Sequence, residues 1–330
     1  TQILKDIGIT DVTIVPEQEY PNGYFTTCSY PNPEIFAALE QGLKLAKETG
    51  ADLMLATDPD ADRVGIAMKC PDGSYELVSG NEVGVLLLDY IAAGRIEKGT
   101  MPKNPVAVKS IVSTPLADAV AEHYGVELRS VLTGFKWIGR EILRMETSGK
   151  GQYLFGFEES YGCLIGTHAR DKDAIVASMA LCEAAAYYKL RGMTIWDAML
   201  EMYERYGYYK DNVIAITHKG IEGLEKIKSI MDTLRKNPPM KFGKYDVLRT
   251  RDYDQDVIRD VKTGETTTTG IPKSNVLYFE LTEDAWLCVR PSGTEPKIKI
   301  YFGVVGSSLE DADAKSEELA EVVQKMLAEM

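Results

Sequence analysis

Three carboxylates at alternate positions are the residues of this 330-residue chain best suited to chemistry. Asp58, Asp60 and Asp62 follow the apolar residues 53–56, and Arg63 comes directly after them. Like charges this close repel one another unless a cation lies among them. Carboxylate oxygens suit Mg²⁺, which leaves positions open for phosphate oxygen, and an arginine offers phosphate a bidentate contact. The segment predicts a metal-assisted phosphate site after a buried strand.

Other structures compete for the same six residues. A solvated surface turn is favoured by Pro59. An EF-hand loop needs glycine at its sixth position and glutamate at its twelfth, where this chain has Arg63 and Lys69. Haloacid-dehalogenase-type phosphatases also place alternating aspartates after an apolar strand, but they carry Thr or Val at the position of Asp62. The motif alone leaves the phosphate–metal site and the surface turn as equal alternatives.

Two acidic segments lie further along the chain. Residues 156–162 read GFEESYG, and their flanking glycines permit a tight backbone that carries carboxylates and hydroxyls. Such groups can hold sugar hydroxyls by hydrogen bonding. Residues 170–173 read RDKD and precede a helical pattern. Taken singly, the first segment is better explained as an ordinary helix N-terminus and the second as a solvated cap.

A basic segment, RPSGTEP at residues 290–296, lies between two predicted strands. Arg290 offers a bidentate phosphate contact, and the hydroxyls of Ser292 and Thr294 flank Gly293, where bare backbone N–H groups can form an anion-binding nest. The alternative is a decorated hairpin turn. Phosphate binding is favoured slightly, because few plain turns need Arg, Ser and Thr together.

Alternating strands and helices must position these segments. Through residue 210 the pattern predicts α/β domains with mixed or parallel sheets. There the predicted strands cover residues 12–15, 53–56, 64–68, 75–78, 106–112 and 153–155. Beyond residue 210, closely spaced strands at 276–281, 285–289 and 297–304 with flanking helices predict a smaller α+β domain.

Composition restricts the class of protein. Hydrophobic residues make up 45% and charged residues 26% of the chain, which is ordinary for a soluble globular protein. The net charge of −13 argues against a nucleic acid or an anionic membrane surface as partner. Five scattered cysteines without a CxxC pair indicate reduced thiols, and three dispersed histidines are too few for a zinc site. No membrane span or signal peptide is visible, so a cytoplasmic location is expected.

The order of the four segments is more informative than any one of them. DPDADR, then TGFKWIG, then GFEESYG with RDKD, then RPSGTEP resembles the α-D-phosphohexomutases over nearly all 330 residues. Within them the chain is most similar to the bacterial phosphoglucomutase/phosphomannomutase branch, related to the phosphopentomutase-like type. The resemblance implies an isomerase that interconverts glucose 1-phosphate and glucose 6-phosphate through a phosphoserine and a bisphosphate intermediate. Mannose and pentose phosphates stay open as substrates.

The resemblance also implies roles for individual residues. The three aspartates of the acidic segment match the Mg²⁺ ligands. Arg63 matches the arginine beside them and Lys172 a lysine near the reacting oxygen, and these two are the implied catalytic residues. His168 lies too far along to match a histidine that some members carry after the Glu-x-Ser pair, and Lys299 is a further basic candidate. The implied substrate-binding residues are Thr133, Gly134, Glu158, Ser160, Arg290, Ser292, Gly293 and Thr294.

One part of the family pattern is missing. The family has four domains, and its first carries a phosphorylated serine in a Ser-His-Asn-Pro setting, whereas no serine here is followed by histidine. We expect a C-terminal fragment that is inactive alone and whose partner is the missing N-terminal domain. Its expected parts are the remainder of domain two at 1–101, domain three at 102–210 and domain four at 211–330. An aspartyl-phosphate phosphatase using Asp58 and a non-catalytic sugar-phosphate binding module stay open.

Overall fold

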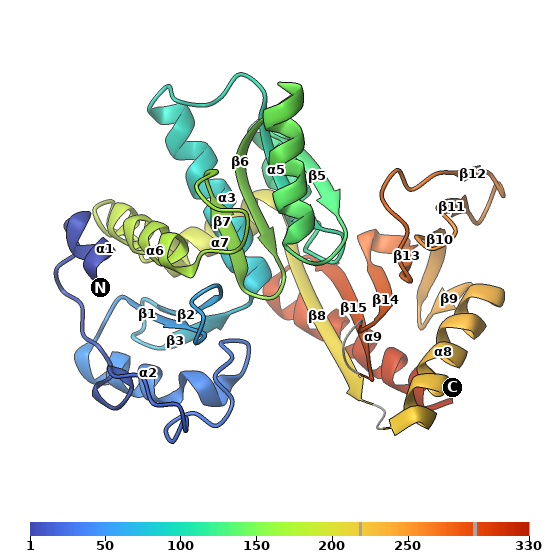
Figure 1. The fold of residues 1–330 in the computed structure, drawn as a ribbon, viewed down its shortest axis with the longest axis horizontal. Helices are drawn as coiled ribbons and strands as arrows, with labels where there is room; N and C mark the ends of the chain where they lie inside the picture. Colours follow the sequence, from blue (N-terminus) through green and yellow to red (C-terminus); the bar gives the residue numbers. More distant parts are fainter. Residues whose placement is uncertain (218–219, 293–295, 330) are drawn as a thin grey trace. The chain divides into compact units, whose positions relative to one another are not determined.

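The structure is a computed structural model that describes residues 1–217, 220–292 and 296–329. It divides into two compact units, Thr1–Tyr206 and Gly207–Met330, each with its own sheets (Figure 1). The predicted domain limits at residues 101 and 210 stay a prediction.

The first sheet of the N-terminal unit is a three-stranded antiparallel meander. Its strands are β1 (Leu53–Thr57), β2 (Val64–Lys69) and β3 (Tyr75–Val78). Helix α2 (Phe36–Thr49) packs Leu39 and Leu43 against Met54 of β1. The helix ends at Gly50, whose φ of +71° is the left-handed conformation that favours glycine. The acidic segment is therefore the loop that joins β1 to β2.

A second, mixed sheet in the same unit has the order β5-β4-β6-β7. Strand β4 is parallel to β5 and β6, whereas β7 is antiparallel to β6. The strands are β4 (Pro105–Ser110), β5 (Glu127–Val131), β6 (Gln152–Glu158) and β7 (Gly162–Ile165). The helices of this unit, after α1 (Gln2–Asp6) and α2, are α3 (Gly80–Glu97), α4 (Leu116–His123), α5 (Lys136–Ser148), α6 (Ala174–Lys189) and α7 (Ile195–Tyr206).

Helices cover both faces of this sheet. A Cβ on Gly84 of α3 would lie 2.1 Å from the Phe157 ring, whereas a Cβ on Gly156 would lie 2.8 Å from Ile138 of α5. Neighbouring residues of a strand face opposite sides of the sheet. Helices α3 and α5 therefore pack on opposite faces of β6.

The C-terminal unit is an antiparallel sheet with the order β12-β11-β10-β13-β14-β15-β8, and β9 pairs with β10. The strands are β8 (Tyr208–Thr217), β9 (Lys241–Phe242), β10 (Tyr245–Asp252), β11 (Val257–Asp260), β12 (Thr266–Thr267), β13 (Leu277–Leu281), β14 (Trp286–Pro291) and β15 (Lys297–Gly306). Helices α8 (Gly220–Lys236) and α9 (Leu309–Glu329) bury Met231, Leu234 and Val323 with Phe279 and Phe302 in one core.

The predicted fold class is confirmed, with differences in detail. Mixed character is found in the second sheet of the first unit, whereas its first sheet is antiparallel. The strand predicted at 12–15 is wrong: these residues are irregular and lead into a short 3-10 helix, Pro16–Gln18. No helix among the described residues has the length and apolar character needed to cross a membrane.

Candidate functional site

The acidic loop, residues 58–63, folds its carboxylates toward one point. Asp58 Oδ1 accepts hydrogen bonds from the backbone N–H groups of Asp62 (3.1 Å) and Arg63 (3.0 Å). Ala61 takes a left-handed conformation, with φ of +54°, which tightens the turn. As a result, one carboxylate oxygen from each of Asp58, Asp60 and Asp62 lies within 4.8 Å of the others.

The electrostatics of the loop favour a cation. Burial is the main cause that raises the pKa of Asp58, and the charges of Asp62 and Asp60 raise it further, against a lowering by the Arg63 N–H. A divalent ion would relieve this repulsion, and three converging carboxylates are ligands that Mg²⁺ accepts. The three aspartates therefore fit the ion that the sequence predicts.

Arg63 lies beside the triad. Its Nε is 3.8 Å from an oxygen of Asp58 and 3.8 Å from one of Asp62, and its Nη1 is 3.5 Å from Glu34 Oε1. The Nε donor is buried, and within the described part of the chain it has no hydrogen-bond partner. A buried donor of this kind is suited to an anion that approaches the loop.

Lys172 reaches the same loop from the RDKD segment. Its Nζ lies 2.9 Å from Asp62 Oδ2 and 3.3 Å from Asp171 Oδ1. Burial alone would lower the pKa of Lys172, but the contacts with Asp62 and Asp171 outweigh burial and raise it. Gly162 makes room for this lysine, because a Cβ there would lie 2.0 Å from Lys172 Cδ.

Main-chain hydrogen bonds hold the segments of this site together. The N–H of Val64 donates to the carbonyl of Tyr161 (3.1 Å), and the N–H of Ala174 donates to the carbonyl of Ala61 (3.1 Å). The GFEESYG segment is the turn of the β6–β7 hairpin, with Glu158 opposite Gly162. The acidic loop, this hairpin and the start of α6 are thereby fixed to one another.

Glu158 lies at the buried end of β6. Its side chain is 6% exposed, and Oε1 accepts a hydrogen bond of 2.5 Å from the N–H of Gly134. Burial first, then the charge of Glu159, raise the pKa of Glu158 to about 7, against the Gly134 N–H and Lys172, which lower it. Thr133 and Ser160 are half-buried. The nine predicted site residues of the N-terminal half thus belong to one unit.

His168 has a local partner. Its Nε2 lies 2.9 Å from Asp173 Oδ2, while Asp173 Oδ1 accepts hydrogen bonds from the N–H groups of Ile175 and Val176 and so caps α6. The charge and hydrogen bond of His168 help to lower the pKa of Asp173 against its burial. His168 therefore acts on the cap of the helix that follows Lys172.

The basic segment belongs to the C-terminal unit. Arg290 in β14 pairs directly with Lys299 in β15, and the N–H of Ser292 donates to the carbonyl of Lys297 (2.7 Å). Two cations opposite one another on a sheet repel unless an anion lies near them. Gly293 and Thr294, both predicted to bind substrate, lie outside the described residues.

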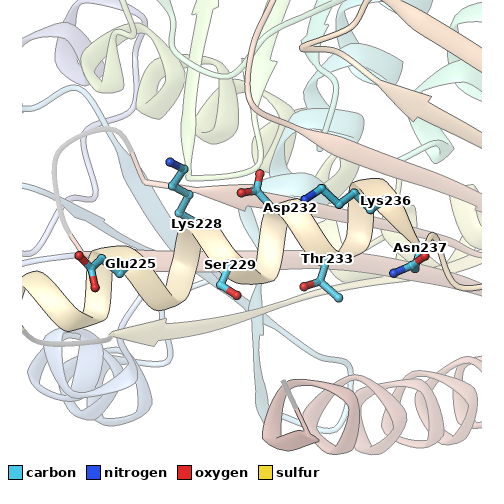
Figure 2. Close-up of a pocket in the computed structure, with 7 residues that line it drawn as sticks. All are labelled: Glu225, Lys228, Ser229, Asp232, Thr233, Lys236 and Asn237. Atoms are coloured by element: carbon cyan, nitrogen blue, oxygen red, sulfur yellow. The ribbon is translucent and has the colours of Figure 1, made fainter.

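The C-terminal unit also has a shallow pocket on its surface. Figure 2 shows its labelled side chains along α8, among them Lys228, Asp232 and Lys236, and at Asn237, which directly follows the helix. Positive and negative groups alternate along this lining. The pocket contains none of the predicted site residues.

Sequence reasoning missed several polar groups near the site. Glu34 contacts Arg63, and Ser110 and Ser113 lie behind the β6–β7 hairpin. The hydroxyls were detectable as polar residues at the end of the apolar run 105–108. Glu34 carried no local signal, because its partner is distant in the chain.

Comparison with known proteins assigns the chain to one family. Models of phosphoglucomutase/phosphomannomutase α/β/α domain II, α/β/α domain III and C-terminal domain match residues 1–73, 79–206 and 254–327. Phosphoglucomutases of Staphylococcus saprophyticus and Staphylococcus aureus strain MRSA252 are 38% and 35% identical over 94% and 95% of this chain. The chain spans 56% of the length of each of these two relatives.

Solved structures agree at the level of the fold. A Paramecium phosphoglucomutase, parafusin, aligns with a TM-score of 0.57 at 18% identity, covering 89% of this chain and 50% of its own. A phosphoglucomutase/phosphomannomutase family protein of Burkholderia thailandensis aligns with a TM-score of 0.54 at 13% identity, covering 89% and 51%.

Proposed function

Because the chain belongs to the phosphoglucomutase/phosphomannomutase family, we propose that it supplies the metal-binding, sugar-recognition and phosphate-recognition parts of a hexose-phosphate mutase. The observation that carries this proposal is the 2.9 Å contact between Lys172 and Asp62. It joins the acidic loop to the segment that follows the β6–β7 hairpin. A positive charge and the carboxylates thus lie together, and phosphoryl transfer needs both to bind a metal ion and to neutralise the phosphate.

The acidic loop is the proposed phosphoryl-transfer end of the site. Asp58, Asp60 and Asp62 would hold Mg²⁺, which when bound neutralises charge on a phosphate oxygen. Arg63 would offer a positive charge beside the three aspartates to an incoming anion, and Lys172 supplies a second positive charge, for stabilisation or for proton transfer at the reacting oxygen.

Sugar recognition is assigned to Thr133, Gly134, Glu158 and Ser160. The Gly134 N–H orients the Glu158 carboxyl, which then accepts hydrogen bonds from sugar hydroxyls. Hydroxyl groups at Thr133 and Ser160 complete the polar lining. Hydrogen bonds to generic hydroxyls suit a sugar that must bind in two orientations, with either end at the reacting phosphate.

The phosphate that is not transferred is assigned to the basic segment. Arg290 and Lys299 are paired across two strands, which places two positive charges on one face of the sheet. Ser292 adds a hydroxyl, and Gly293 and Thr294 complete the proposed set. The net charge of −13 makes such a local concentration of cations necessary for an anionic ligand.

The proposed reaction interconverts glucose 1-phosphate and glucose 6-phosphate through a phosphoserine and a bisphosphate, in the cytoplasm. Mannose and pentose phosphates are further candidate substrates. Because no serine of these 330 residues is followed by histidine, the polypeptide is expected to show no turnover alone and to need the phosphoserine-bearing domain as partner.

Calorimetry with glucose 1-phosphate and Mg²⁺ tests the proposal. The full chain is expected to bind, and Arg290→Ala is expected to weaken binding by about tenfold or more, because an ionic hydrogen-bond partner is lost. Arg249→Ala is the matched control, since Arg249 lies in the same sheet and pairs with Glu280. Equal affinity in all three proteins contradicts the phosphate assignment, and an aspartyl-phosphate trapped at Asp58 would indicate a phosphatase instead.

A further inference from the structure

The end of β4 holds buried polar groups that none of the proposed roles uses. Ser110 and Ser113 are 0% and 3% exposed, and the neighbouring Lys109 Nζ donates to the carbonyl of Thr114 (2.9 Å) and pairs with Asp118. Buried hydroxyls are costly unless they are hydrogen-bonded. Their partners therefore indicate what they stabilise.

The two hydroxyls form a directed chain that ends on the sugar-recognition hairpin. Ser110 Oγ donates to Glu159 Oε2 (2.8 Å), and Ser113 Oγ lies 2.9 Å from Ser110 Oγ. A serine hydroxyl has a single proton to donate. Since Ser110 gives its proton to Glu159, Ser113 must donate to Ser110, and the chain runs from Ser113 to Glu159.

The start of α3 packs closely against the backbone of the same hairpin. A Cβ on Gly80 would lie 2.3 Å from the carbonyl oxygen of Glu159 and 2.4 Å from the nitrogen of Tyr161. The neighbouring Asn81 accepts a hydrogen bond from the N–H of Thr114 (3.0 Å). The backbone of Glu159 is thus held by α3, while its side chain is held by the hydroxyl chain.

We infer that Ser110 and Ser113 are positioning residues for sugar recognition and act through Glu159. This inference rests on the proposed function of Glu158 and Ser160, the two residues that flank Glu159. By fixing the first residue of the turn, which lies between Glu158 and Ser160, the hydroxyl chain sets where the carboxyl of Glu158 meets Gly134 and where Ser160 presents its hydroxyl.

Hydrogen exchange of the Gly134 amide tests this without any ligand, because that amide donates to Glu158. In Ser110→Ala the Gly134 amide is expected to exchange about tenfold faster, since the partly buried Glu159 carboxylate has lost the hydrogen bond from Ser110. Glu159→Gln keeps an acceptor oxygen for Ser110 and is expected to retain most of the protection. Ser316→Ala is the control: Ser316 is 2% exposed in the other unit and is hydrogen-bonded to Asn212.

Glucose 1-phosphate calorimetry on the same proteins separates the two claims. Faster Gly134 exchange with about tenfold weaker binding supports the positioning role. Unchanged exchange in Ser110→Ala overturns it, as does equal acceleration of all amides of β4, which indicates a general loss of stability. If the unchanged protein binds no glucose 1-phosphate while Ser110→Ala still shows faster exchange of the Gly134 amide, that result overturns the proposed function but supports the hydroxyl chain.

Discussion

At the scale of single residues, Glu158 is a carboxyl group whose surroundings oppose its charge. Burial first, then the charges of Glu159 and Asp171, raise its pKa to about 7 against the Gly134 N–H and Lys172, which lower it. The folded state therefore holds this proton more tightly than the unfolded state, in which a glutamate titrates near 4.5. Its contribution to the free energy of unfolding falls as pH rises from about 4.5 to about 7.

Carbon-13 NMR titration of the Glu158 carboxyl checks this directly. We expect a midpoint near pH 7 in the unchanged protein and a lower midpoint in Glu159→Gln, because a nearby negative charge is gone. Glu17→Gln is the control, an exposed acid in the same unit. A midpoint near 4.5 in the unchanged protein contradicts the assigned environment of Glu158.

Lys172 and a divalent cation compete for Asp62. Removing the ammonium group in Lys172→Met frees that carboxylate and removes a positive charge, so the chain should bind Mn²⁺ about tenfold more tightly. Mn²⁺ titration by electron paramagnetic resonance measures the affinity. Lys189→Met is the matched control, because Lys189 pairs with Asp52, which precedes β1. Weaker Mn²⁺ binding in Lys172→Met contradicts this arrangement.

At the scale of elements, α3 shows how differently glycines of one helix can act. A Cβ on Gly84 would lie 2.1 Å from the Phe157 ring, whereas a Cβ on Gly94 meets nothing within 4 Å. We expect Gly84→Ala to destabilise the protein by about 1–3 kcal/mol through overpacking. Gly94→Ala should stabilise it by about 0.5–1 kcal/mol, because alanine favours helix. Urea unfolding measures the free energy of unfolding of both variants. Equal changes in the two would contradict the close packing of α3 on β6.

Local sequence signals predicted most strands of the first unit. The apolar runs at 53–56 and 64–68 gave β1 and β2, and the alternating acids between them gave the acidic loop. The strand predicted at 12–15 is wrong because an apolar pattern alone does not provide a neighbouring strand, and residues 12–15 pair with none in the described sheets. Strands β5 and β9–β12 lacked a clear signal, since exposed faces and short lengths weaken alternation.

Sequence alone could propose the site residues but not their contacts. The contact of Lys172 with Asp62 spans 110 positions, and no local pattern encodes it. Likewise, GFEESYG read as a loop or a helix start, whereas pairing of Glu158 with Gly162 makes it a hairpin turn. Both the Lys172–Asp62 contact and the hairpin depend on tertiary interactions, which a local sequence pattern does not encode.

At the scale of the whole molecule, the C-terminal unit has a hydrophobic core of its own. The buried core residues come from positions 227–327, Ile214 and Ile216 of β8 pack against them, and β8 is joined to β15 along ten paired positions. Residues 207–330 should therefore fold as an isolated polypeptide, with dispersed amide signals in a nitrogen-15 NMR spectrum. Poorly dispersed amide signals would contradict the independent folding of residues 207–330.

A core substitution extends this test to the full chain. Phe302→Ala removes a buried ring and should destabilise the C-terminal unit by about 3–5 kcal/mol. Amide exchange in the strands of the N-terminal unit should stay unchanged. Accelerated exchange in both units would show that they unfold together.

The main-chain links from Val64 to Tyr161 and from Ala174 to Ala61 have an evolutionary consequence. They depend on peptide groups, which every residue except proline can offer in full. Mutations can therefore exchange the acids and hydroxyls carried by these turns, and with them substrate preference, while the turns keep their alignment. Such a scaffold lets specificity drift without rebuilding the architecture beneath it.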